Sequence, residues 1–293
     1  MIQTNMNLEE KIQYSIHLIQ KAEKLALQYS PDGFHLAFSG GKDSQTLYEL
    51  TCMAGVKFHA EMSVTTVDPP ELMKFVRRYY PQVKLNRPKI NMFHLIEKKK
   101  GLPRMNIRYC CQILKEQAGA GTVTLLGIRA AESVKRAKRN EVEISGHKFS
   151  GSLDQFNIFK ETQTACIKGK DKIMVSPIFH WTDEDVWHFI RSRNMPYCKL
   201  YDMGFTRIGC MFCPMSRPKT KAIERQMYPR METAYKKAIQ FCIDRNGYGN
   251  THQMSADEIF DCWVNNQPFS AVLEKRKQLN IEFENAQKIA SDR

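Results

Sequence analysis

The sequence predicts an α/β fold in which helices flank a parallel sheet, and three observations carry that prediction. Short apolar runs alternate with amphipathic helical periods through the first two thirds of the chain, the pattern of a parallel sheet and the helices that cover it. A glycine-rich turn, "SGGKDS", joins the first apolar run to a helical pattern. From Pro218 onward the pattern is mostly helical. We therefore expect a Rossmann-like sheet with a mostly helical C-terminal portion.

The elements of the first half follow from periodicity and turn residues. Apolar residues recur at helical spacing from Leu8 to Ala26, and the turn residues Ser30-Pro31-Asp32-Gly33 follow. A later pattern begins with Pro69, a residue suited to the first turn of a helix. The predicted elements are a helix over 8–29, a strand over 34–38, a helix over 45–53, a strand over 57–66, a helix over 69–79, a strand over 84–86, a helix over 93–99 and a strand over 122–126.

The second half departs from this regularity. Residues 140–171 mix Ser, Gly, Lys and Thr with scattered aromatics and show no sustained period, so we expect an irregular or hairpin excursion over the active face. A strand over 172–175 and a helix over 182–193 follow, the helix begun by Thr182 with acidic residues in its first turn. Five residues here are expected to organise the fold and not to take part in chemistry: Trp181, Asp183, Glu184, Asp185 and Trp187.

Composition limits the classes of function. The 293 residues include 44 Lys and Arg against 31 Asp and Glu, a net charge of +13. This excess favours anionic partners such as nucleotides, nucleic acid or acidic proteins, although a solvated basic surface explains it equally well. No run of 18 apolar residues occurs, and the N-terminus lacks the basic start and apolar stretch of a signal peptide. We expect a cytoplasmic protein with no membrane partner.

The turn "SGGKDS" has the chemistry of an anion cradle. Gly40 and Gly41 allow backbone N–H groups to approach a ligand closely, and the following helix N-terminus adds partial positive charge. Lys42 supplies a full charge, and Ser39 and Ser44 supply hydroxyl donors. The order of residues differs from the common phosphate loop, in which the lysine ends a longer G-x-x-x-x-G-K motif. An ordinary tight turn before a capped helix is the alternative.

The nine cysteines favour metal or redox chemistry over disulfides, because their number is odd and we expect an intracellular protein. Five stand alone, and a lone cysteine is most often a small buried hydrophobic residue: Cys52, Cys166, Cys198, Cys242 and Cys262. The other four form an adjacent pair, Cys110 and Cys111, and a C-x-x-C pair, Cys210 and Cys213. An iron–sulfur cluster, a zinc ion and structural thiols all remain open.

These motifs together resemble a known family. "SGGKDS" matches the SGGxDS signature of the pyrophosphate-loop ATPase superfamily. With the two cysteine pairs, "LLGIRAAES", "PIFHWTDEDVWHFI" and "PYCKLYDMGFTRIGCMFCPM", the chain resembles phosphoadenosine phosphosulfate (PAPS) reductases, and more narrowly the cluster-bearing adenosine phosphosulfate (APS) reductases. The resemblance implies an adenine nucleotide alpha-hydrolase-like fold and three parts: an N-terminal helix over 1–33, a nucleotide-binding domain with iron–sulfur cysteines over 34–216 and a helical appendage over 217–293.

The resemblance also implies site residues. Cys110, Cys111, Cys210 and Cys213 would hold a 4Fe–4S cluster, and Arg129 would contact the nucleotide, unless it forms a surface salt bridge with Glu132. The basic run "KRAKR" at residues 135–139 would be a solvated face or would steer a polyanion.

One part of the family pattern is missing. Sulfonucleotide reductases use a cysteine in a C-terminal E-C-G-[IL]-H motif, and this tail contains no cysteine. Cys242 and Cys262 stand in apolar helical contexts, which raise a thiol pKa.

The first hypothesis is therefore an enzyme of sulfur transfer that splits ATP with release of pyrophosphate, with nucleic acid as one substrate and a cysteine desulfurase as one sulfur donor. Lys42 would neutralise phosphate charge, Asp43 would orient the loop or a Mg²⁺ ion, and Ser39, Gly40, Gly41 and Ser44 would hold the pyrophosphate. The alternatives are an APS or PAPS reductase with a displaced thiol and a non-catalytic nucleotide-binding subunit.

Overall fold

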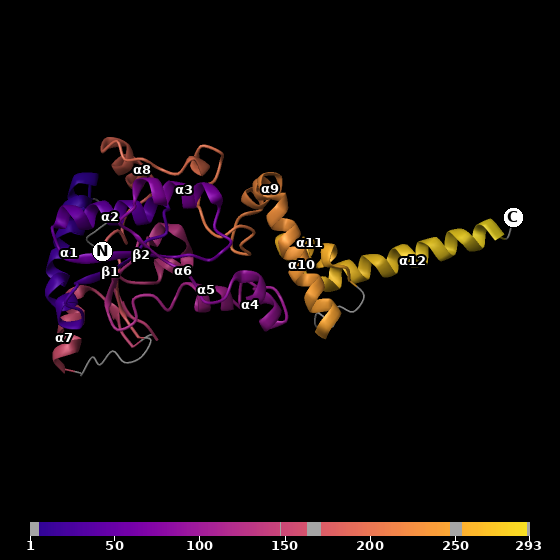
Figure 1. Ribbon diagram of the computed structural model, residues 1–293, viewed down its shortest axis with the longest axis horizontal. Helices are drawn as coiled ribbons and strands as arrows, with labels where there is room; N and C mark the ends of the chain where they lie inside the picture. Colours follow the sequence, from indigo (N-terminus) through magenta and orange to yellow (C-terminus); the bar gives the residue numbers. More distant parts are fainter. Residues whose placement is uncertain (1–5, 147, 163–170, 247–253, 292–293) are drawn as a thin grey trace. The chain divides into compact units, whose positions relative to one another are not determined.

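The computed structural model describes residues 6–146, 148–162, 171–246 and 254–291 (Figure 1). The chain forms two compact units, and each contains separate stretches of sequence. The first consists of Met1–Pro88 and Cys111–Gly209, and the second of Lys89–Cys110 and Cys210–Arg293. In the described ranges, every helix is too short or too polar to cross a membrane.

The first unit is built on a seven-stranded sheet within the described residues, with the strand order β3-β2-β1-β4-β7-β5-β6. The four pairings among β3, β2, β1, β4 and β7 are parallel, whereas β5 lies antiparallel to both β7 and β6. The predicted parallel sheet is confirmed, with an antiparallel edge added. The strands are β1 (Phe34–Ala37), β2 (Phe58–Ser63), β3 (Lys84–Asn86), β4 (Val123–Leu125), β5 (Val142–Ile144), β6 (Ser150–Gly151) and β7 (Ile173–Val175).

Helices connect these strands. Helix α1 packs against α2, β1 and β4, and α2 also packs against α8. Short α5 begins in the second unit and ends in the first. The helical segments are α1 (Leu8–Tyr29), α2 (Lys42–Ala54), α3 (Pro70–Tyr79), α5 (Tyr109–Leu114), η1 (Ala130–Glu132), α6 (Val134–Ala137), α7 (Leu153–Thr162), α8 (Asp183–Ser192) and η2 (Lys199–Tyr201).

The core contact between α1 and the sheet involves a buried polar group. Trp181 is 1% exposed, and its indole N–H donates to Ser15 Oγ at 3.1 Å, while the Ser15 hydroxyl donates to the Pro177 carbonyl at 2.8 Å. Both polar side chains are therefore satisfied inside the core. Trp181 is the core anchor that the sequence predicts, but Trp187 is only half-buried.

The two faces of the sheet differ in polarity. Phe34 and Leu36 of β1 are fully buried, and the alternate residue His35 lies in register between His59 and Thr124. Burial lowers the pKa of His35 to about 4, so its imidazole is neutral at pH 7. Gly119 lies directly against this histidine, because a Cβ there would come within 2.4 Å of His35 Nδ1.

The second unit is helical in its described residues. Helix α10 packs against α4, α9 and α11. Its Tyr235 is 1% exposed and contacts the rings of Phe212, Phe260 and Trp263 at centroid distances of 6.0, 6.2 and 5.1 Å. This aromatic cluster forms the core of the unit. The helices are α4 (Met92–Lys99), α9 (Pro218–Met227), α10 (Pro229–Asn246), α11 (Ala256–Val264) and α12 (Phe269–Ser291).

Most element predictions are confirmed to within a few residues, but three segments differ. The stretch 140–171 is not only a hairpin excursion: β5 joins the main sheet beside β7, and α7 follows. Residues 163–170, which include Cys166, lie outside the described part. Helix α5 carries the adjacent cysteines in a stretch with no predicted element, and α2 begins three residues earlier than expected, at Lys42.

A pair of glycine variants tests the packing on the polar face. Gly119 and Gly121 have φ angles of 72° and 73°, but only at Gly119 would a Cβ meet neighbouring atoms. We expect Gly121→Ala to lower the free energy of unfolding by about 1 kcal/mol through backbone strain alone. Gly119→Ala should lower it by roughly 2 kcal/mol more, because His35 and Thr124 must move. Urea unfolding measures both, and equal losses would contradict the described packing.

Candidate functional site

The glycine-rich turn leads directly from β1 into α2. Gly40 has a φ of 72°, and a Cβ there would lie 2.7 Å from side-chain carbons of both Leu72 and Val76 on α3. A residue with a side chain would have to displace α3. Gly41 is the N-cap of α2 and has no side-chain cap. Gly41 itself therefore offers the first backbone N–H groups of the helix no acceptor that would compete with an anion, although a side chain from elsewhere in the chain accepts the Lys42 N–H.

The hydroxyls of Ser39 and Ser44 hold the turn together. Ser44 Oγ donates to the Gly41 carbonyl at 2.9 Å and accepts from the Ser39 backbone N–H at 3.2 Å. The two hydroxyl oxygens lie 3.1 Å apart. The serines thus close the loop on itself, and the geometry gives them a structural role in addition to the predicted role of donors to a ligand.

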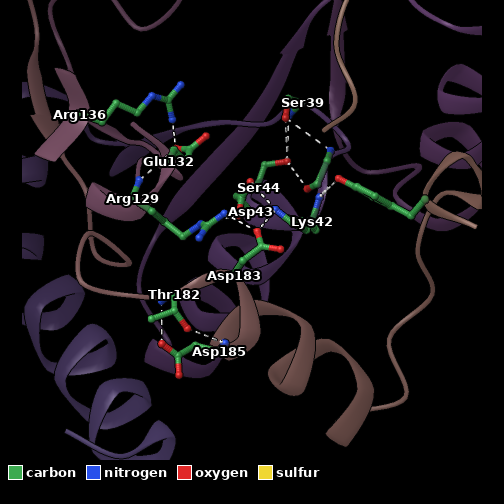
Figure 2. A network of polar contacts seen from close by, with 12 residues as sticks. Ser39, Lys42, Asp43, Ser44, Arg129, Glu132, Arg136, Thr182, Asp183 and Asp185 are labelled. Carbon is green, nitrogen blue, oxygen red and sulfur yellow. Dashed lines mark hydrogen bonds and ion pairs between the residues drawn. The ribbon is translucent and has the colours of Figure 1, made fainter. Parts of the chain in front are cut away.

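Two cations and two carboxylates meet at the start of α2 (Figure 2). Lys42 Nζ lies 2.8 Å from Asp183 Oδ1 and 3.4 Å from Asp43 Oδ1. Arg129 donates from Nε to Asp43 at 2.7 Å and from Nη2 to Asp183 at 2.9 Å. Each cation contacts both carboxylates. The side chains of Lys42 and Arg129 are only 4% and 3% exposed, whereas that of Asp183 is 56% exposed.

These contacts explain how two cations tolerate burial. A buried charge is costly unless it is paired and hydrogen-bonded, and Asp43 and Asp183 supply that pairing here. Partial burial acts to raise the pKa of Asp183, but Lys42 and Arg129 outweigh it and hold that pKa below its ordinary value. The carboxylate therefore stays ionised at neutral pH. The expected alternative for Arg129 is wrong, because Glu132 accepts from its backbone N–H and not from its guanidinium.

Further basic residues approach this cluster from α6 and from the segment before the C-x-x-C pair. Arg136 pairs with Glu132. Burial, with the like charges of Arg207, Arg139 and Arg129, lowers the pKa of Arg136 to about 10. The run at residues 135–139 is therefore only partly a solvated face: Lys135 and Lys138 are exposed, and Arg136 is half-buried beside the loop.

Tyr201 of η2 also reaches the loop. The Lys42 backbone N–H donates to its phenolic oxygen at 2.8 Å. Its ring packs edge-to-face against Trp187, with centroids 4.9 Å apart. A surface depression of 440 Å³ runs along α8 nearby and is lined by Asp183, Glu184, Asp185, Trp187, His188 and Arg191.

In the second unit, the C-x-x-C pair forms a tight turn whose backbone is held by buried side chains. The Cys213 N–H donates to the Cys210 carbonyl at 3.3 Å. Phe212 has a φ of 57°, and its N–H donates to Glu224 Oε2 at 2.9 Å. Lys221 Nζ donates to the Pro214 carbonyl at 3.5 Å. Glu224 and Lys221 are each 2% exposed, so two buried polar side chains of α9 hold the turn through its backbone.

Three of the four paired cysteines affect the ionisation of one phenol. Burial raises the pKa of Tyr235 well above its ordinary value, and the thiols of Cys210, Cys213 and Cys110 add to that rise. The fourth cysteine, Cys111, belongs to the first unit, where it begins the stretch Cys111–Gly209. Across the described ranges, no three His, Cys, Asp or Glu side chains converge closely enough to hold a metal ion. The four-cysteine site thus remains a prediction.

The lone cysteines mostly behave as expected. Cys198, Cys242 and Cys262 are each 1% exposed, and burial raises the pKa of all three thiols. Cys52 is the exception, because it is exposed on α2.

The predicted site residues of the first unit therefore come together, and the structure adds others. Ser39, Gly40, Gly41, Lys42, Asp43, Ser44 and Arg129 share one cluster around the start of α2. Sequence reasoning missed Asp183, Arg136 and Tyr201. The available signals were the seven-residue spacing from Arg129 to Arg136 and the position of Asp183 in the first turn of a helix after a sheet strand.

The comparisons with known proteins agree with the motifs. The family model for the phosphoadenosine phosphosulfate reductase domain matches residues 33–216. This match covers more than half of the chain, and the chain belongs to that family.

Individual relatives are distant. An uncharacterised protein of Methanocaldococcus jannaschii is 28% identical over 228 residues, 73% of this chain and 43% of that protein. Adenosine 5'-phosphosulfate reductase 2 of Bacillus subtilis strain 168 is 26% identical over 220 residues, 70% of this chain and 84% of that enzyme. A crystal structure of phosphoadenylyl-sulfate reductase from Candida auris is 15% identical, covers 72% of this chain and 98% of its own, and has a TM-score of 0.44. The chain spans 43% and 54% of the length of two M. jannaschii relatives.

Removing the charge of Asp183 should strengthen anion binding. The carboxylate neutralises Lys42 and Arg129, so an incoming phosphate competes with it. We expect Asp183→Asn to bind inorganic pyrophosphate about tenfold more tightly without Mg²⁺, a change of about 1.4 kcal/mol. Isothermal titration calorimetry measures it. Glu184→Gln, which removes the neighbouring exposed carboxylate, is the control and should leave affinity unchanged. Weaker binding by Asp183→Asn would show that the carboxylate does not compete.

The buried Glu224 predicts a pH dependence of stability. Burial raises the pKa of Glu224 to about 7, against the opposing effects of the Phe212 N–H and Lys221. A raised pKa means that the stabilisation is complete below the unfolded pKa and is lost as pH rises through the folded pKa. We therefore expect the chain to lose about 3 kcal/mol of unfolding free energy from this group between roughly pH 4.5 and 8.

Thermal and urea unfolding at several pH values measure this loss. Glu224→Gln retains an acceptor for the Phe212 N–H and should flatten the profile. Glu232→Gln is the matched control on α10: the pKa of Glu232 is lowered, chiefly by Arg225, so this variant should keep the wild-type slope. A wild-type protein equally stable at pH 5 and pH 8 would contradict the assignment.

Proposed function

We propose that this chain binds the phosphate end of an adenine nucleotide at residues 39–44 and acts on its phosphoanhydride. The observation that carries the proposal is that two buried cations, Lys42 and Arg129, meet at the N-terminus of α2, whose N-cap residue supplies no side-chain cap. Cationic side chains at a helix N-terminus are features that bind phosphate. Membership of the PAPS reductase family supports an adenine nucleotide as the ligand.

Each loop residue has a distinct role in this proposal. Lys42 and Arg129 neutralise charge that develops on the phosphates during bond cleavage. Gly40 and Gly41 bring the backbone close to the phosphates, and the hydroxyls of Ser39 and Ser44 hold both the loop and the leaving group. Asp43 fixes the Arg129 guanidinium at 2.7 Å and supplies a carboxylate oxygen of the kind that a nucleotide-bound Mg²⁺ takes as a ligand.

We further propose that Cys110, Cys111, Cys210 and Cys213 hold a 4Fe–4S cluster, as in the cluster-bearing APS reductases that the chain resembles. The chemistry of the donor set supports this, since thiolates are the usual ligands of such clusters. Three of these thiols act on the pKa of one phenol, that of Tyr235. Such a cluster would supply electrons or a local charge. Zinc bound by the same thiols is the alternative that an iron assay decides.

The proposed reaction is ATP-dependent activation for sulfur transfer. The acceptor atom attacks the α-phosphate, the bond between the α- and β-phosphates breaks, and pyrophosphate leaves with that electron pair. The outer sulfur of a persulfide, carried by a donor such as a cysteine desulfurase, then attacks the activated atom and AMP leaves. A second thiol attacks the remaining S–S bond, so that the thiolated acceptor is released and the two donor sulfurs end as a disulfide. The net charge of +13 and the exposed Lys135 and Lys138 support nucleic acid as the acceptor.

Reduction of APS or PAPS is the second candidate, and one observation favours it. The chain is similar to the APS reductase 2 of B. subtilis over 84% of that enzyme's length. The burial of two helical cysteines counts against it. Cys242 and Cys262 are buried, and their pKa values are raised, whereas an attacking cysteine needs an accessible thiolate.

Anaerobic purification followed by iron and sulfide assays and substrate trials tests these proposals. The protein receives ATP with Mg²⁺ and RNA or DNA as the acceptor, then APS, then PAPS, with pyrophosphate and sulfite as the measured products. We expect iron, pyrophosphate from ATP and no sulfite. Lys42→Met should lower pyrophosphate release about 100-fold, and Lys24→Met, which removes an exposed lysine of α1, should not. Sulfite from APS or PAPS would select the reductase, and nucleotide binding without turnover would indicate a regulatory subunit.

A further inference from the structure

The hydroxyl of Tyr201 occupies a position inside the phosphate loop that neither the motif nor the proposed roles above assign. It accepts the Lys42 backbone N–H at 2.8 Å, and a Cβ on Gly41 would lie 3.4 Å from it. One of the first N–H groups of α2 is therefore already bonded to a phenol. A ligand oxygen cannot take that N–H directly while Tyr201 stays in place.

The direction of this hydrogen bond leaves the phenolic proton free. A tyrosine hydroxyl has one proton to donate in addition to its lone pairs, and here a lone pair receives the Lys42 N–H. Among the residues that the structure describes, no acceptor takes the Tyr201 proton. An O–H group is thus available at the first residue of α2, and the side chain of that same residue, Lys42, belongs to the cation and carboxylate cluster of the loop.

We propose that Tyr201 is a further nucleotide-binding residue, whose hydroxyl relays the Lys42 N–H by donating its own proton to a phosphate oxygen of the bound nucleotide. This inference rests on the proposed function, because it concerns the same phosphate site. The phosphate then lies one hydroxyl farther from the helix than in a loop whose amides bind it directly.

The surroundings of Tyr201 suit a fixed donor. Its ring stands edge-to-face to Trp187 at 4.9 Å and 89°, and Trp187 in turn contacts Tyr197 at 5.4 Å. These contacts hold the ring, so little freedom is lost when a ligand binds. Burial raises the pKa of Tyr201, and the charges of Asp43 and Asp183 add to that rise. The hydroxyl therefore keeps its proton throughout the physiological pH range.

The charge of the cluster makes a neutral donor useful. Lys42 and Arg129 are balanced by Asp43 and Asp183, and each cation already contacts both carboxylates. A phosphate that enters this site must share those cations with the carboxylates. The hydroxyl of Tyr201 offers a hydrogen bond that no carboxylate of the cluster uses.

Tyr201→Phe and Tyr197→Phe are a matched pair for the test. Both remove one hydroxyl from the same aromatic cluster, but the Tyr197 hydroxyl bonds to Asp202 at 3.1 Å and not to the loop. Calorimetric titration of the full chain with ADP, ATP and inorganic pyrophosphate measures binding. We expect Tyr201→Phe to weaken all three about tenfold, the usual effect of losing one hydrogen bond to a charged group. Tyr197→Phe should bind as the wild type does, and both variants should bind adenosine, which has no phosphate, unchanged.

Hydrogen exchange adds a measurement that needs no ligand. In the free protein, the Lys42 amide should exchange faster in Tyr201→Phe than in the wild type or Tyr197→Phe. Equal exchange would overturn the hydrogen bond on which the inference depends. Unchanged or tighter binding by Tyr201→Phe would overturn the donor role, and tighter binding would mean that the phenol blocks the amide. If the wild type binds none of the three phosphate ligands, the proposed function fails, and the role of Tyr201 fails with it.

Discussion

The pairing of Lys42 and Arg129 with Asp43 and Asp183 is the interaction on which the first unit depends. Four charged groups meet beyond the carboxyl ends of the central strands β1 and β4. They come from three parts of the chain, which are α2, the segment after β4 and the first turn of α8. Two nearly buried cations would be costly without those partners. The constraint therefore fixes where β1 and β4 end relative to α8, and it gives the turn at residues 39–44 its orientation.

The fold was largely predictable because local pattern and tertiary structure agree in most of the first unit. The helix over Leu8–Tyr29 has the bounds that its apolar spacing predicts, and the parallel order around β1 follows from strands that alternate with helices. The failures have two causes. Val142–Ile144 is a strand only because it pairs with β7, and Tyr109–Leu114 is too short to show a helical period. Periodicity within a segment does not reveal what that segment pairs with.

Site residues were predictable where the local backbone conformation requires one residue type. They were less predictable where a side chain from another element supplies a charge or a hydrogen bond. The turn needs glycine at Gly40 because of its positive φ and the closeness of α3, so the motif is visible in the sequence. Asp183 and Tyr201 reach the same point from other elements, and nothing near them in sequence distinguishes them from a helix-capping acid and a core aromatic. The helix-capping role belongs to Thr182 and Asp185, whose mutual bonds form the capping box. Two acids of one helical turn thus have different roles that only the coordinates separate.

The carboxylate of Asp183 competes with any anion that approaches Lys42 and Arg129. The Asp183 carboxylate already lies 2.8 Å from Lys42 Nζ and 2.9 Å from Arg129 Nη2. A monovalent ion such as chloride would have to replace these contacts, and its single negative charge would bind the cations no more strongly than the carboxylate does. A polyphosphate brings several charges at once and can satisfy both cations while the displaced carboxylate, more than half exposed, turns to water. In the proposed function, this arrangement favours polyphosphates over small monovalent anions.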